Sequence, residues 1–200
     1  SLWRVGVNHS QELPNDFKFR GVLDLESQNS LNQIVNDNTE ERTRRNTDSY
    51  AAVNKIWDDS SLDIITRYRQ STDSTKDDTW GELPKIAYKV QRTPIGQTPF
   101  YFNLDTSAAW FVTDLKPEHD DDFFFKTSRL DFHPQLSIPI KVAPWLSTSQ
   151  TLGVRETFYG KGLVIDYAPG GTFGAFKKLP NFTRESFDVL STLQGPKFSK

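Results

Sequence analysis

Apolar and polar residues alternate with a period of two along most of this chain, the pattern of β-strands whose two faces meet different surroundings. In residues 100–111, for example, Leu104 and Trp110 share one face while Asn103 and Asp105 share the other. No long window shows the apolar spacing of an amphipathic helix. Similar alternation covers residues 17–26, 62–69, 85–91 and 187–194. The sequence therefore predicts an all-β chain of about nine strands.

Turn residues mark the connections between the predicted strands, and these connections are alternately short and long. The short ones lie near residues 10–15, 58–61, 93–99 and 141–145, and the long ones near 27–48, 71–81, 113–122 and 160–183. In an antiparallel up-and-down meander, this alternation puts all short turns at one end and all long loops at the other. Transmembrane barrels of outer membranes have this organisation, so the pattern predicts a segment of a large transmembrane barrel.

Strand length and residue type agree with a barrel wall. Tilted strands of about 9 to 11 residues cross the hydrocarbon core, and most predicted strands are at least that long. The polar face mixes Ser, Thr, Asn and Gly with charges of both signs, as a water-filled lumen requires. Aromatic residues also fall near the predicted strand ends, where a headgroup-level girdle is expected: Trp3, Phe17, Trp57, Trp80, Phe100, Trp110, Trp145, Phe158 and Tyr159.

Three prolines interrupt the strand pattern between Arg129 and Trp145. Proline donates no hydrogen bond to a ladder, which confines it to edges, bulges and strand ends. We expect Pro139 and Pro144 to flank a short turn, and Pro134 to form a bulge within a long strand.

Composition limits the possible functions. The chain has 200 residues with a net charge of −2, so no overall positive field favours nucleic acid. It has no cysteine, which excludes disulfides and thiolate chemistry within these residues. The opening residues lack the features of a signal peptide, so we expect any such peptide to lie outside them. We therefore interpret residues 1–200 as part of one outer-membrane β-barrel domain.

The charges on the polar face are the candidate binding residues. In a barrel wall they would meet the lumen, where a plug protein or an anionic headgroup docks. Glu156 breaks the alternation beside Arg155 and is expected near the rim. The candidates are Arg67, Arg69, Lys85, Lys89, Arg129, Asp131 and Arg155.

Other motifs favour a plain structural interpretation. His9, His119 and His133 lie on separate elements without metal-ligand spacing and are expected on the polar face or in loops. The acidic run 118–122 lacks the spacing of a calcium loop, and the basic run 40–46 has glutamates beside it. The glycine-rich residues 167–176 precede no helix that would bind phosphate. We predict no cofactor, no metal and no enzymatic activity.

Several motifs resemble the lipopolysaccharide-assembly outer-membrane protein family (LptD, also called OstA), over most of the chain and in the right order. They include the Leu83-Pro84 pair that opens a strand and the R-x-D-x-x-P-x-L-x-x-P run from Arg129 to Pro139. The G-x-R-E-T-x-Y strand from Gly153 to Tyr159 is similar too, as is the T-R-E…G-P-K pair within residues 183–197.

The resemblance implies transport rather than catalysis, in the cell outer membrane. It implies lipopolysaccharide as the ligand, an LptE-like lipoprotein as a plug in the barrel, and a periplasmic bridge that delivers the lipid. The family's periplasmic jelly-roll domain, its lateral-gate strands and its disulfide cysteines have no recognisable counterpart in these residues. About nine strands are too few for the family's barrel, so we interpret the chain as a central slab of strands.

Two alternatives remain open from the sequence. One is another outer-membrane barrel, such as a porin-like channel or an outer-membrane enzyme. The other is a soluble all-β carbohydrate-binding or hydrolase domain that uses paired carboxylates and aromatic platforms. The soluble domain predicts a water-soluble monomer, whereas the membrane barrels predict a chain that needs detergent.

Overall fold

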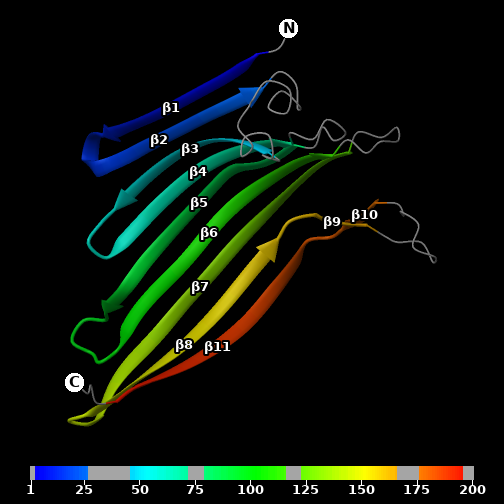
Figure 1. The fold of residues 1–200 in the computed structure, drawn as a ribbon. Helices are drawn as coiled ribbons and strands as arrows, with labels where there is room; N and C mark the ends of the chain where they lie inside the picture. The colour runs from blue at the N-terminus through cyan, green and yellow to red at the C-terminus, as the bar shows by residue number, and fades with distance from the viewer. Residues whose placement is uncertain (1–2, 27–45, 72–78, 116–122, 166–175, 196–200) are drawn as a thin grey trace.

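The computed structural model describes residues 3–26, 46–71, 79–115, 123–165 and 176–195. Nine antiparallel strands form one sheet in the order β1-β2-β3-β4-β5-β6-β7-β8-β11, which confirms the predicted meander. Figure 1 shows that this sheet is open, with β1 and β11 as its edges. The strands are Arg4–Leu13 (β1), Phe17–Glu26 (β2), Asn46–Ile56 (β3), Ser60–Ser71 (β4), Thr79–Pro94 (β5), Tyr101–Leu115 (β6), Phe123–Ala143 (β7), Leu146–Tyr159 (β8) and Phe182–Gln194 (β11).

The two ends of the sheet differ as the sequence predicts. The short turns gather at one end, at the left of Figure 1, and include the 3-10 turn Pro14–Asp16 and residues 144–145. The strand ends that flank residues 27–45, 72–78 and 116–122 lie at the other end. The connection after β8 holds an unpredicted feature, a separate hairpin of β9 (Gly162–Ile165) and β10 (Phe176–Leu179).

Residues paired across antiparallel strands share a face, so the register sorts the side chains into two sets. On the apolar face Leu136 pairs with Leu152, which pairs with Val189. On the polar face Asp131 lies between Ser107 and Thr157. These two faces are called the apolar face and the polar face below.

The sheet has no hydrophobic core of its own in the described part of the chain, where Ala109 is the buried hydrophobic residue. The large side chains of the apolar face are exposed instead, with exposed fractions of 76% for Phe187 and 70% for Leu193. An apolar surface of this extent marks an interaction site rather than a water-facing surface. The apolar face therefore requires an apolar environment.

The aromatic residues follow the predicted girdle only in part. Trp57 and Trp145 lie at the short-turn end and are exposed, but Trp80 and Tyr159 pair with Arg69 and Arg129 on the polar face. Trp110 is on the apolar face but inside β6, which continues beyond it to Leu115.

The bulge predicted at Pro134 is wrong. The β6–β7 register runs through Pro134 without a shift, and the β7–β8 register has the same offset before and after it. Each strand residue directs its N–H toward one neighbour only, so this proline weakens one ladder and leaves the other intact. Pro144 does lie in the β7–β8 turn, whereas Pro139 lies inside β7 and pairs with Ser149.

Register shifts occur elsewhere, at three places. One is opposite Ile65–Arg67, where Leu83-Pro84 adds a residue to β5. The others lie between Val90 and Thr93 and between Lys141 and Ala143. The edge strands are β1 and β11, with β1 paired only to β2 and β11 only to β8 among the described strands. No helix in the described ranges has the length and apolar character to cross a membrane.

Candidate functional site

All the candidate binding residues named from the sequence lie on the polar face. Arg67 pairs with Glu82, and Arg69 pairs with Trp80. Lys85 and Arg129 lie on either side of Ala109, on β5 and β7. The remaining three follow from the same registers: Lys89 pairs with Asp105, Asp131 with Ser107, and Arg155 lies two residues before Thr157, the partner of Asp131.

A short ion pair on this face joins β7 to β8. Arg155 donates from Nε to Asp131 Oδ1 at 2.9 Å and from Nη2 to Oδ2 at 2.6 Å, a bidentate arrangement. The Asp131 side chain is 8% exposed and the Arg155 side chain 50% exposed. Among the described residues, the buried carboxylate forms its ion pair with this guanidinium, and the charge of Arg129 on the same strand also acts on it.

Acidic residues that the sequence analysis did not single out neutralise most of the other cations. Asp48 Oδ2 accepts from Arg69 at 3.2 Å and its Oδ1 lies 3.7 Å from Arg67 Nε. Lys89 Nζ lies 3.2 Å from Asp105 Oδ2 and Lys85 Nζ lies 3.8 Å from Glu82 Oε1. Alternation identifies the face of each acid, but only the register shows which cation it meets.

Arg129 differs from these paired cations. Its guanidinium carbon lies 6.0 Å from the centre of the Phe111 ring, and its buried Nε makes no hydrogen bond to the described residues. No acid among the described residues forms an ion pair with Arg129, although Asp131 on the same strand lies within range of its charge. A guanidinium suits a carboxylate or phosphate. Arg129 is therefore the candidate best placed to meet an anionic ligand.

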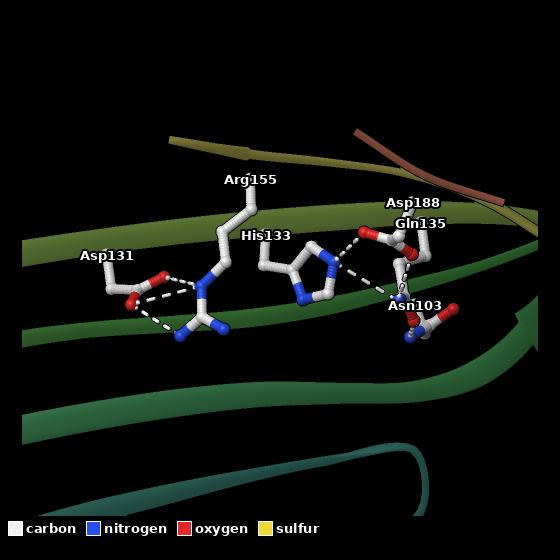
Figure 2. Close-up of polar contacts among 6 residues, drawn as sticks. All are labelled: Asn103, Asp131, His133, Gln135, Arg155 and Asp188. Atoms are coloured by element: carbon white, nitrogen blue, oxygen red, sulfur yellow. Dashed lines mark hydrogen bonds and ion pairs between the residues drawn. The ribbon is translucent and has the colours of Figure 1, made fainter. Parts of the chain in front are cut away.

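A second polar cluster, which we call the polar clasp, consists of Asn103, His133, Gln135 and Asp188 (Figure 2). His133 Nε2 lies 2.9 Å from Asp188 Oδ1, and Gln135 Nε2 donates to Asp188 Oδ2 at 3.2 Å. Asn103 Nδ2 donates to Gln135 Oε1 at 2.6 Å. The polar clasp thus connects β11 to β7 and β6 by side chains.

The polar clasp reaches over β8 because Gly153 lies beneath it. Gly153 pairs with Asp188 on one side and with Gln135 on the other, and a Cβ added to it would overlap the Asp188 carboxylate. The clasp also lies beside Pro134, where the β7–β8 ladder lacks an N–H donor. Side-chain bonds therefore reinforce the sheet where the β7–β8 pairing is interrupted, between Phe132 and Gln135.

A hollow of about 420 Å³ lies beside the polar clasp, and Lys89, Arg92, Asp105 and Ser137 line it together with clasp residues. Arg92 lies over the Tyr101 ring at 4.7 Å and donates to Ser149 Oγ at 3.3 Å, so its side chain spans from β5 to β8. Ser137 is 3% exposed. The polar face is therefore partly covered by its own long side chains.

We expect Arg155→Lys to lower the free energy of unfolding by about 1–2 kcal/mol, because an ammonium cannot reproduce the bidentate bonds to buried Asp131. Solvent screening of the half-exposed Arg155 side chain keeps the value in this low range. Urea unfolding followed by tryptophan fluorescence in vesicles measures it. Arg184→Lys is the matched control, since Arg184 is exposed on the same face opposite Thr157. Equal losses in the two variants would refute the assigned role of the pair.

The remaining residues and runs singled out in the sequence are placed as follows. The runs 40–45 and 118–122, with His119, and most of 167–176 lie outside the described residues. The expectation that His9 lies on the polar face is wrong: its ring is 5.8 Å from Phe19 on the apolar face. Glu156 is also on the apolar face, opposite Glu185 and three residues before β8 ends. The described residues contain no group of His, Asp and Glu that would hold a metal ion.

Comparison with known families gives a match over most of the chain. The family model described as LptD, LPS transport system D, matches residues 3–189, which is most of the chain. The chain matches none of the curated proteins. The matched segment contains the ion-paired polar face and the polar clasp.

Proposed function

The chain belongs to the LptD family, and on this premise we propose that residues 1–200 are part of one β-barrel domain in the cell outer membrane. Its role is lipopolysaccharide transport and assembly at the outer membrane. The observation that supports the proposal is a meander sheet with one exposed apolar face, one polar face and no hydrophobic core among the described residues. Lipid on one side and a water-filled lumen on the other satisfy both faces.

The family match favours this function over a porin-like channel or a soluble carbohydrate-binding domain. A soluble domain would also have to cover the apolar face with a second layer, and no described element does so. The barrel wall binds and guides lipid, and the proposal assigns no catalytic residue to it.

The polar-face charges line the lumen in this proposal. Arg67, Arg69, Lys85 and Lys89 carry acid partners and keep the wall hydrated and close to neutral. Arg129 has no acid partner among the described residues, and it offers its guanidinium to phosphate or carboxylate groups of the lipopolysaccharide headgroup.

The partners follow from the same premise. An LptE-like lipoprotein occupies the lumen as a plug and contacts the polar face, and a periplasmic bridge delivers lipopolysaccharide to the barrel. The mixed charges of the polar face suit a protein surface, because paired ions exchange partners at small cost in a wet environment.

Cysteine labelling in intact cells tests the orientation of the wall. We expect cysteine at Leu104 or Tyr88, on the apolar face, to react with a lipid-phase reagent and poorly with a water-soluble thiol reagent. Cysteine at Asn103 or Lys89 should show the reverse preference. The native chain has no cysteine, so there is no background labelling within these residues. Equal labelling of both sets from water would overturn the membrane assignment and the transport role built on it.

A further inference from the structure

Charged residues are rare on the apolar face. On β2, β3 and β4, the described apolar-face residues include a single lysine or arginine, Lys55, and no aspartate or glutamate. Lys55 lies at the end of β3 beside the short turn that follows, and it pairs with Leu62 of β4. A charge at this place lies where the apolar face meets the short-turn rim of the sheet.

Two aromatic rings hold the Lys55 ammonium. Its Nζ lies 4.9 Å from the centre of the Phe17 ring and 5.0 Å from the centre of the Trp57 ring. Among the described residues it has no hydrogen bond or ion pair, although Asp58 and Asp59 are in the adjacent turn. The amine is therefore placed by cation–π contacts and its charge is not neutralised by a carboxylate.

We propose that Lys55, Phe17 and Trp57 form a binding site for the phosphate of an anionic phospholipid headgroup in the leaflet at the short-turn end. The site rests on the proposed membrane orientation. Aromatic rings of this kind prefer the headgroup level, where one edge is apolar and the other is wet. A lysine at that level keeps its stem in apolar surroundings and directs its ammonium to the phosphates.

The opposite end of the apolar face supports the choice of leaflet. There Glu156 and Glu185 are direct cross-strand partners, and like charges in that position repel each other. These acids would also repel a phosphate, whereas Lys55 attracts one. Lys126 also lies on the apolar face toward that end, on β7, so the two acids disfavour a phosphate at the β8–β11 part of that rim.

Lipid retention measured by native mass spectrometry tests the site. The full-length barrel protein that contains these residues is refolded into vesicles of equal parts phosphatidylcholine and phosphatidylglycerol and transferred to detergent, and the bound molecules of each lipid are counted. We expect the chain to retain phosphatidylglycerol preferentially, and Lys55→Gln to lower that preference about fivefold, the effect of one cation at a lipid surface. Lys55→Arg should keep the preference, since it keeps the charge and the ring contacts.

Lys18→Gln is the matched control. Lys18 pairs with Asn54, next to Lys55 along β3, but on the polar face. The proposal is overturned if Lys18→Gln lowers the preference as much as Lys55→Gln, if Lys55→Gln leaves it unchanged, or if millimolar inorganic phosphate displaces the lipid. Heat-modifiable migration on a gel verifies that each variant is folded. If the membrane orientation itself is wrong, the cysteine labelling described above shows it, so failure of the orientation and failure of the lipid site are distinguishable.

Discussion

Leu152→Arg is expected to lower the free energy of unfolding in a bilayer by about 2–4 kcal/mol, the cost of an arginine on the lipid face near the midplane. Leu152 lies on the apolar face, opposite Val189, and is 57% exposed. In a membrane, that exposed fraction contacts acyl chains rather than water. Urea unfolding of the full-length barrel protein refolded in vesicles measures the loss.

Leu190→Arg provides the matched control. Leu190 is 60% exposed, lies on the neighbouring strand and pairs with Thr151, but on the polar face. The same substitution at nearly equal exposure is expected to change the free energy of unfolding by less than about 1 kcal/mol, because the new charge meets water. A water-soluble sheet predicts small and equal effects for both leucines, so equal effects would contradict the barrel-wall proposal.

Alternation was sufficient to predict the fold because a one-residue change in register would move every side chain to the other face. The pattern around Leu104 and Asn103 therefore identified both faces without any knowledge of neighbouring strands. Turn residues located the connections within a few positions for the same local reason. The β9–β10 hairpin was missed because its strands are short and lie within a segment rich in turn signals.

The candidate site was predictable only in part, because its contacts depend on which strands are neighbours. Arg155 and Asp131 were both named as candidates, but their pairing follows from the β7–β8 register. Asp188 was not named, since its role depends on reaching across a strand that lacks a side chain. Pro134 was assigned to a bulge because the sequence does not show which neighbour a residue's N–H faces.

The polar clasp gives the second large effect. We expect Gly153→Ala to lower the free energy of unfolding by about 2 kcal/mol, because its Cβ would lie 2.6 Å from Asp188 Cγ and displace the carboxylate. Asp188 would then lose its bonds to His133 and Gln135, and hydrogen bonds to a charged group contribute about 1.5–3 kcal/mol each before solvent screening. The better strand propensity of alanine offsets part of this loss. Urea unfolding in vesicles again measures the change.

A double-mutant cycle separates the polar clasp from a general intolerance of side chains at this position. Asp188→Ala removes the carboxylate, so Gly153→Ala introduced into that variant should cost almost nothing more. Gly6→Ala is the control for alanine in a strand, because no atom lies within 4 Å of a Cβ added there, and we expect it to be neutral or slightly stabilising. If the cost of Gly153→Ala persisted in the Asp188→Ala background, the displaced carboxylate would not be its cause. The reinforcement of the β7–β8 ladder by Asp188 would then have to be abandoned.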